Sequence, residues 1–462
     1  MELMLFIEDY LPIFMFCTLA ALLFSGYPVA FILGGLAFLF GMIGYSMGMF
    51  ALIEFFNFVP RIWGTAAENL VLVAVPTFVF MGVMMERSGI ANDLLYCCQV
   101  LLKKVPGGLA LSVTIMGTIL AAMTGIIGAS VTMMTALALP TMLRQRYSHA
   151  LATGTIAASG TLGILIPPSI MLIIMADLLA VSVGNLFMAA LMPGLCLAAI
   201  YLTFIVTLSA VRPSVAPPLP PDLLYVPRKE LPMLLFRSFF PPVFLIGLIK
   251  GSILMGWATP SEAGAVGAFG ATLLAAINRR LGWETIKGVC QSAGLTISFI
   301  FFIVISATCF AYVFRSLGGD DIVEELIFAA GLDSWGLLFL ILGIVFALGF
   351  FLDWLEITLI ILPVFAGMIV DMDFGDHVPL EAMVYWFTVL IAINLQTSFL
   401  TPPFGFSLFY LKAAAPPGVG TRDIYRGALP YVALQFLALA LVMLFPAIAQ
   451  WLPAAMDRLQ GF

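Results

Sequence analysis

Apolar runs of about 20 residues, separated by short polar stretches, follow one another along almost the whole chain. A transmembrane helix needs about 20 predominantly apolar residues, so each run of that length predicts a membrane span. The pattern therefore predicts an all-α polytopic membrane protein. The runs lie near residues 8–25, 27–48, 67–86, 107–143, 147–180, 185–211, 237–254, 257–278, 291–314, 333–370, 382–411 and 428–452.

Two of these runs, 107–143 and 333–370, are too long for one span, and each has a glycine-containing polar interruption near its middle. This shape is typical of a re-entrant helical hairpin, whose two half-depth arms enter and leave the membrane on the same side. Non-helical backbone at membrane depth is tolerated where protein or water covers it. With two hairpins, we expect about ten true spans.

The basic residues support this arrangement, because the loops on one side hold 15 of the 19 Lys and Arg residues. By the positive-inside rule that side is cytoplasmic, which predicts that both termini lie outside. If either hairpin were a full span, the later loops would change sides and the bias would disappear. The 15 residues are Arg87, Lys103, Lys104, Arg144, Arg146, Arg212, Arg228, Lys229, Arg237, Arg279, Arg280, Lys287, Lys412, Arg422 and Arg426, and the other four are Arg61, Lys250, Arg315 and Arg458.

Composition agrees with a membrane protein. The chain of 462 residues is 63% hydrophobic and 10% charged, whereas a soluble domain has roughly 25% charged residues. The six cysteines lie mostly in apolar runs with no CxxC spacing and no nearby His, so we expect small core residues rather than metal ligands or disulfides. The N-terminus has no basic n-region or small-residue cleavage site, so we expect no cleaved signal peptide. We also expect no cofactor and no nucleic-acid partner.

The chain is predicted to consist of two repeats joined by a Pro-rich, charged cytoplasmic linker. Each repeat has three spans, one hairpin and two more spans, and because five spans is an odd number the second repeat is inverted. Inverted repeats with interrupted segments in corresponding places indicate the site of a secondary transporter. The predicted ranges are 1–211 and 234–462 for the repeats, 212–233 for the linker, about 107–145 and 333–370 for the hairpins, and 147–180 and 382–412 for two broken helices.

The two hairpins share a weak sequence similarity. In each, a polar residue is followed at intervals of five by Thr and then Pro before the hairpin's second arm ends. The two sets are Ser130, Thr135, Pro140 and Asp353, Thr358, Pro363. The second hairpin thus has an acid where the first has a serine, which makes equal ion geometry at the two tips doubtful.

A helix broken by a double proline follows each hairpin, in "SGTLGILIPPS" (159–169) and "NLQTSFLTPPFGFS" (394–407). Proline removes a backbone donor and clashes with the preceding turn, so two in a row free carbonyls at mid-membrane. Free carbonyls beside Ser, Thr, Asn and Gln oxygens suit a hard cation, and helix N-termini at the same level favour an anion. Ordinary helix packing also uses small residues and hydroxyls, but the duplicated arrangement predicts an ion and substrate site.

Asp353 and Glu356, near the second hairpin's tip, are the acids close to this constellation. An intramembrane acid indicates function by default, so we predict an ion or gate role for both. The alternatives are a position near the outer water surface or a pairing with a partner subunit. No Lys or Arg falls in the central part of either hairpin or in either double-proline stretch, 159–169 or 394–407. Anion binding would therefore rest on helix ends, hydroxyls and bound Na⁺.

Five motifs in order, "GASVTMMTALALPTM", "SGTLGILIPPSIMLI", "GWATPSEAGAVGA", "FLDWLEITLIILPV" and "NLQTSFLTPPFGFSLFYLK", resemble the large membrane subunit of tripartite ATP-independent periplasmic (TRAP) transporters. The resemblance runs nearly end to end. It implies an elevator-type fold of the ion-transporter superfamily, with a mobile transport domain and a fixed scaffold. It also implies Na⁺-coupled uptake of an organic acid across the bacterial inner membrane. The partners it implies are a periplasmic substrate-binding protein and a separate small four-helix membrane subunit.

The resemblance also implies site residues, carried over by position. The implied sodium ligands are Gly128, Ser130, Ser159, Gly160 and Thr161 in the first half and Asp353, Asn394, Thr397, Ser398 and Thr401 in the second. The implied substrate contacts are Thr132, Thr135, Pro168, Thr358 and Pro403.

Two other classes of function remain open. A membrane-embedded enzyme acting on a lipid would need a buried cluster of His, Asp and Glu, and the chain offers only "DMDFGD" in a loop. A channel, carboxylate transporter or antiporter of the same superfamily would work without a binding protein. The substrate also stays open among a C4-dicarboxylate, a 2-oxo acid and a sugar acid.

Overall fold

The protein is described by a computed structural model covering residues 10–124, 127–218, 226–227, 229–403 and 405–460. Within these ranges it contains helices and no strand, which confirms the predicted all-α fold class. The first half comprises α2 (Leu11–Leu23), α3 (Val29–Ser46), η1 (Leu52–Asn57), α4 (Phe58–Ile62), η2 (Trp63–Ala67), α5 (Ala74–Arg87), α6 (Ile90–Leu102), α7 (Gly108–Thr124), α8 (Ile127–Arg144), α9 (His149–Thr161), η3 (Leu162–Ile164), α10 (Ile170–Leu178) and α11 (Val183–Val211).

The second half begins after the Pro-rich stretch. It comprises α12 (Leu231–Leu234), η4 (Leu235–Phe239), α13 (Phe240–Leu254), α14 (Pro260–Ile277), α15 (Trp283–Ser316), α16 (Gly319–Ala329), α17 (Ser334–Leu348), α18 (Trp354–Val370), η5 (Gly375–His377), α19 (Leu380–Leu400), α20 (Phe406–Ala414), α21 (Thr421–Leu444) and α22 (Ala447–Gln460). The exact ends of the two repeats and of the linker stay predictions.

The chain is a multi-pass membrane protein. Eight helices of the described chain are long and apolar enough to cross a membrane, or nine when α16 and α17, bent by 120°, form one broken span. The sequence predicted about ten spans because it counted apolar runs. Several of those runs fold as shorter helices, such as Leu11–Leu23, or are interrupted, as α9 and α10 are.

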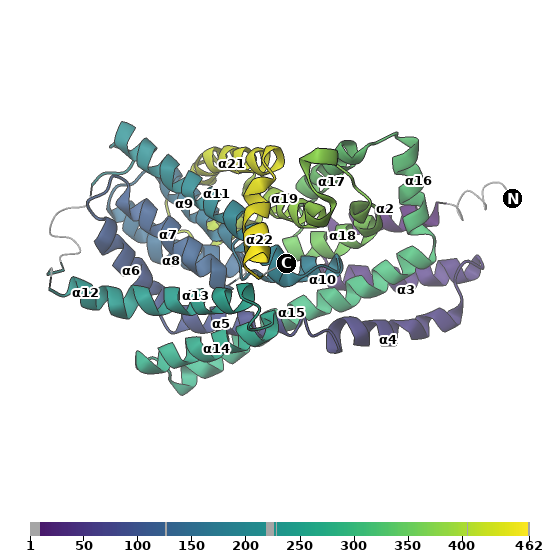
Figure 1. Ribbon diagram of the computed structural model, residues 1–462, viewed down its shortest axis with the longest axis horizontal. Helices are drawn as coiled ribbons and strands as arrows, with labels where there is room; N and C mark the ends of the chain where they lie inside the picture. The colour runs from purple at the N-terminus through teal and green to yellow at the C-terminus, as the bar shows by residue number, and fades with distance from the viewer. Residues whose placement is uncertain (1–9, 125–126, 219–225, 228, 404, 461–462) are drawn as a thin grey trace.

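The two halves repeat one succession of elements, and their contacts are matched. Each long run predicted as a hairpin folds as two packed helices, α7 with α8 and α17 with α18. The second arm of each hairpin packs on the broken helix of the other half, α8 on α20 and α18 on α10. Likewise α9 packs on α21 and α19 packs on α11. In Figure 1 the hairpins lie on opposite sides, with α19 and α21 between them and α14, α15, α3 and α4 along one edge.

Local sequence determines where several helices begin. Thr259 caps α14, because its hydroxyl accepts a hydrogen bond from the Glu262 N–H and the Glu262 carboxylate accepts one from the Thr259 N–H. Pro260 follows at the first helical position, where the missing N–H has no intrahelical partner to lose.

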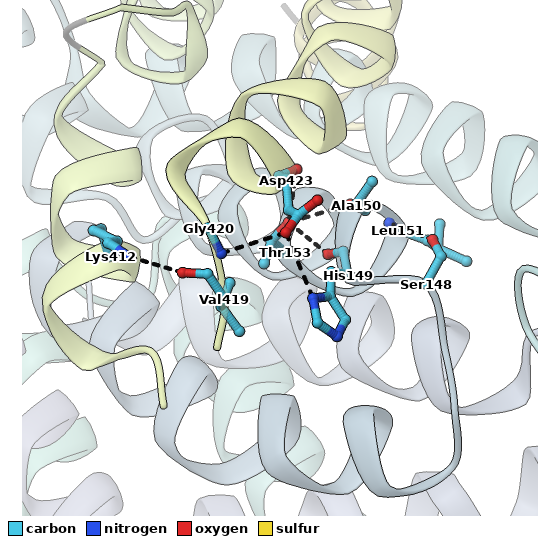
Figure 2. Close-up of polar contacts among 9 residues, drawn as sticks. All are labelled: Ser148, His149, Ala150, Leu151, Thr153, Lys412, Val419, Gly420 and Asp423. Atoms are coloured by element: carbon cyan, nitrogen blue, oxygen red, sulfur yellow. Dashed lines mark hydrogen bonds and ion pairs between the residues drawn. The ribbon is translucent and has the colours of Figure 1, made fainter. Parts of the chain in front are cut away.

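The helices α9 and α21 meet at a close crossing (Figure 2). At the crossing Gly154 and Gly427 face each other so closely that a Cβ on either would overlap the backbone of the other helix. Beside it, His149 Nδ1 lies 3.5 Å from Asp423 Oδ2, and Thr153 Oγ1 donates to the Asp423 carbonyl over 3.4 Å. Gly420 N–H donates to the same carboxylate over 3.3 Å. The crossing thus joins the two halves through backbone contact and a polar cluster.

Candidate ion and substrate site

A double proline interrupts each broken helix and removes backbone hydrogen-bond donors there. The N–H of residue i normally bonds the carbonyl of residue i−4, so Pro168 leaves the Ile164 carbonyl without its helical partner and Pro403 does the same to Phe399. In each half a serine beyond the break replaces the lost donor. Ser169 Oγ donates to the Ile164 carbonyl over 2.7 Å, and Ser407 Oγ donates to the Phe399 carbonyl over 2.8 Å. Both serines are fully buried.

The two broken helices meet at one polar contact in the interior. Gln396 Nε2, from α19, donates to Thr161 Oγ1, the last residue of α9, over 3.2 Å. Thr161 in turn donates to the Ala158 carbonyl over 2.9 Å. The other atom of the amide, Gln396 Oε1, is buried and has no hydrogen-bond partner among the described residues. An unpaired buried acceptor is costly, so this oxygen is a candidate position for a cation or a donor.

The structure brings the first set of predicted sodium ligands together on α8 and α9. Ser130, Ser159 and Thr161 are all buried. Gly160 lies against Val131 of α8, where a Cβ would overlap the valine side chain. Ser159 Oγ donates to Thr114 Oγ1 of α7 over 3.2 Å. The cluster therefore lies between the first hairpin and its broken helix.

The second set, apart from Asp353, lies on α19 and its C-cap and faces the second hairpin through Asn394 and Ser398. Asn394 Nδ2 donates to the Leu342 carbonyl of α17 over 2.7 Å, which leaves its amide oxygen available. The hydroxyls of Thr397, Ser398 and Thr401 donate to carbonyls of their own helix at 2.8, 2.8 and 2.7 Å. A hydroxyl that donates its proton keeps oxygen lone pairs, which a cation can use. The bonding pattern is compatible with ion binding.

Asp353 is positioned differently from the rest of its set. Its carboxylate caps α18 by accepting from the Trp354 N–H over 2.8 Å, and Glu356 accepts from the Asp353 N–H over 3.2 Å. The two acids thus form a capping box that starts the helix. Ser130 lies three residues inside α8, so the equal spacing in sequence does not give the two residues equal places in their helices.

Tyr410 of α20 lies against the start of the second arm of the first hairpin. Its ring lies against Gly128, where a Cβ would be 2.8 Å from the ring Cζ atom. The start of α8 therefore packs against α20.

The predicted substrate contacts fall into unlike environments. Thr132 and Thr135 donate to carbonyls of α8, at 2.7 Å for the Gly128 carbonyl and 2.6 Å for the Val131 carbonyl. Thr358 is 1% exposed, and its hydroxyl has no partner among the residues placed by the structure. Pro168 is buried, whereas Pro403 is exposed and its carbonyl accepts from Tyr425.

Sequence reasoning missed Gln396, Ser169, Ser407 and Tyr410. Gln396 lies inside the quoted motif, and one long amide in an apolar helix was a usable signal. The serines follow the double prolines, so counting which carbonyls the prolines free would have indicated them. For Tyr410 the sequence carries no signal, since its role comes from the packing of α20 on α8.

A family model described as the tripartite ATP-independent periplasmic transporter DctM component matches residues 16–448. The chain belongs to this family. Three curated TRAP transporter large permease proteins show the range of its relatives. The C4-dicarboxylate protein DctM of Pseudomonas aeruginosa is 29% identical over 84% of this chain and 87% of its own length. The ectoine protein TeaC of Halomonas elongata is 28% identical over 95% and 98%, and the sialic acid protein SiaM of Vibrio cholerae is 27% identical over 94% and 96%.

The chain also resembles the solved structure of the Alcanivorax borkumensis YdaH transporter. The TM-score is 0.58 at 14% identity, over 87% of this chain and 89% of that one, so the likeness concerns the fold alone. The matched relatives are permease subunits rather than enzymes, which confirms the expectation of a transporter and removes the membrane-enzyme alternative. The names of the TRAP relatives cover unlike substrates, so membership in the DctM family leaves the substrate open.

Proposed function

We propose that this DctM family member carries out Na⁺-coupled uptake of an organic acid by an elevator motion. The observation that supports it best is the buried Gln396 Oε1, an acceptor with no partner in the described chain, beside Thr161 where the two broken helices meet. A bound cation would satisfy this oxygen. The surrounding donor set is hydroxyl, amide and carbonyl oxygen, which suits a hard cation.

The coupling ions would bind in two clusters. The first would use Ser130, Ser159 and Thr161. Gly128 and Gly160 have no side chain, so the backbone at these two positions would come close to the ion. The second would use Asn394, Thr397, Ser398 and Thr401, with Asp353 supplying the charge that the first cluster lacks. This division is consistent with the capping role of Asp353, because a carboxylate has about four lone-pair sites and its cap uses only part of them.

The substrate carboxylate would bind between the two clusters. No Lys or Arg lies between Lys104 and Arg144, in 333–370, or in the double-proline stretches 159–169 and 394–407. The helices α10 and α20 both begin just beyond the double prolines, and helix N-termini favour an anion. Thr358 would donate its free hydroxyl, and Thr132 and Thr135 would line the opposite arm. Bound Na⁺ would neutralise the acid as well as drive its uptake.

An elevator motion would move the hairpins and broken helices past a scaffold that includes α5, α14 and α15. A cleft of about 580 Å³ separates Met133 and Leu137 of α8 from Glu86 at the end of α5 and Glu284 at the start of α15. These ends carry the loops predicted to be cytoplasmic. The cleft would provide the space into which the first hairpin opens when it releases the acid.

The positive-inside bias supports an inner-membrane orientation with both termini in the periplasm. In that orientation the outer loops would meet a periplasmic substrate-binding protein. A separate small four-helix membrane subunit would pack on the lipid-facing side of the scaffold.

The test is uptake into proteoliposomes containing this chain, its small subunit and the binding protein, with the acid identified by thermal-shift screening of that binding protein. We expect uptake that needs an inward Na⁺ gradient and stops when K⁺ replaces Na⁺. Equal uptake in Na⁺-free buffer would remove the coupling. Full uptake without the binding protein would instead establish a binding-protein-independent carboxylate transporter.

A further inference from the structure

A separate cavity of about 210 Å³, with three charged residues in its lining, lies beside α18. It is enclosed by α4 and η2, the ends of α10 and α15, and α18. Its charged lining consists of Arg61, Asp177 and Arg315, and its hydroxyls come from Thr65, Thr308 and Tyr312. Arg61 and Arg315 both belong to the loops predicted to be periplasmic, so the cavity is on the outer side.

Two of the three charged groups are already paired. Asp177 accepts two hydrogen bonds from Asn69 Nδ2, at 2.8 and 2.9 Å. Arg315 Nε lies 3.3 Å from Asp320 Oδ2, and Arg315 Nη2 donates to the Pro363 carbonyl of α18 over 2.7 Å. These two groups are held in place by protein partners.

Arg61 is different, because it has no hydrogen bond or ion pair within the described ranges. Its guanidinium carbon lies 4.3 Å from the centre of the Tyr312 ring. That ring is fixed, since its hydroxyl accepts from Asn57 over 2.8 Å and donates to Glu54 over 3.2 Å. Arg61 therefore stacks one face on a held ring while its five N–H donors remain free. This orientation suits a carboxylate, which a guanidinium binds through two parallel hydrogen bonds.

We propose that this cavity is an outer carboxylate-binding site, with Arg61 as the group that takes the carboxylate. Its place in uptake rests on the proposed function. Leu359 lines the cavity and directly follows Thr358 on α18, so an acid leaving Arg61 would enter along the arm that carries the free hydroxyl. The volume lies below the roughly 300–1,000 Å³ of pockets for drug-sized ligands, which indicates a small acid.

The experiment measures binding in this cavity without transport. The six native cysteines are replaced by serine, and Thr65→Cys is introduced as a half-buried reporter in the cavity wall. An anionic methanethiosulfonate labels the reporter in the absence and presence of succinate, with succinamide as the neutral control and NaCl matching ionic strength. We expect succinate, and not succinamide, to slow labelling.

The Arg61 variants decide the assignment. In Arg61→Ala, losing a charge-assisted pair should raise the succinate concentration for half-protection by about tenfold or more. In Arg61→Lys the succinate concentration for half-protection should lie between those of the parent and Arg61→Ala, because Lys keeps the charge and loses the two parallel hydrogen bonds. Arg458→Ala, which removes another predicted periplasmic charge outside the cavity, should leave protection unchanged. Equal protection in Arg61→Ala, or none in the parent, would overturn the site.

This measurement separates the two proposals. Protection that depends on Arg61, with uptake that ignores Na⁺, would keep the outer site and remove the coupling. Na⁺-dependent uptake without protection at the reporter would keep the proposed function and remove the outer site.

Discussion

Gln396 Nε2 donates to Thr161 Oγ1 over 3.2 Å, and this bond joins the two halves of the chain in the protein interior. Thr161 is the last residue of α9, and Gln396 lies one turn before the end of α19. Both side chains are fully buried. The contact places the two helix breaks side by side, so an ion at one break would be coupled to the position of the other.

We predict that Gln396→Leu weakens Na⁺ dependence. The change removes the unpaired Oε1 acceptor and the donor to Thr161 at similar volume. The Na⁺ concentration for half-maximal uptake should rise by about tenfold, which corresponds to about 1.4 kcal/mol. Na⁺ titration of proteoliposome uptake measures it.

Gln435→Leu is the matched control. Gln435 is also a fully buried glutamine with an unpartnered amide within the described chain, but it lies on α21 and not on a broken helix. Its Na⁺ titration should equal that of the parent. If both variants shift alike, the effect comes from packing, and Gln396 is not an ion ligand.

A second prediction concerns Asp353, whose cap and charge can be separated. Asn is as good an N-cap as Asp, so Asp353→Asn should keep the start of α18 and leave thermal stability close to that of the parent. Without the charge, the second cluster should bind Na⁺ more weakly, and the Na⁺ titration should move to higher concentration.

Asp353→Ala is the comparison that removes both the N-cap and the charge. It should lower stability by about 0.5–2 kcal/mol through loss of the cap, measured by thermal unfolding in detergent. Should Asp353→Asn titrate like the parent, Asp353 would be a helix cap alone and would leave the proposed ion site.

Much of the fold was predictable because membrane spans and hairpins follow from apolar length, glycine interruptions and charge bias. The site was predictable at the level of segments, since double prolines inside apolar runs must free carbonyls. The pairing of side chains within the site was not predictable. Which oxygen stays unpaired at Gln396 depends on how α19 packs against α9, and a capping box at Asp353 depends on where α18 starts. Spacing in sequence equated Ser130 with Asp353, while the structure gives them different places in their helices.

We predict that Thr358 contributes to substrate affinity rather than to the free energy of unfolding. Its hydroxyl is buried without a partner in the part of the chain described, so Thr358→Val should leave the free energy of unfolding unchanged or raise it. Affinity for the acid should fall, seen as a higher KM in uptake. Thr388→Val is the control for removing a buried hydroxyl already bonded to a carbonyl, at a position outside the proposed sites. An unchanged KM in Thr358→Val would exclude a substrate contact.

The serines beyond the breaks should matter for folding in both halves alike. Ser169→Ala and Ser407→Ala each leave a buried carbonyl, of Ile164 or Phe399, without its donor. Each should cost about 1–3 kcal/mol of unfolding free energy. Ser252→Ala removes an ordinary intrahelical hydroxyl bond on α13 and should cost less. Equal, small losses in all three would show that the serines do not hold the breaks.

Gly349 fits α17 against α19 only because it lacks a side chain. A Cβ there would overlap the Ser398 side chain, so Gly349→Ala should destabilise the protein by about 1–3 kcal/mol through overpacking. Gly343→Ala, on the same helix with nothing within 4 Å of the new Cβ, should be neutral or stabilising. Ser398→Gly should restore stability to Gly349→Ala, because it removes the overlapping atoms. Thermal unfolding measures all three, and a Gly349→Ala protein as stable as Gly343→Ala would show that the hairpin is not seated on α19 at this contact.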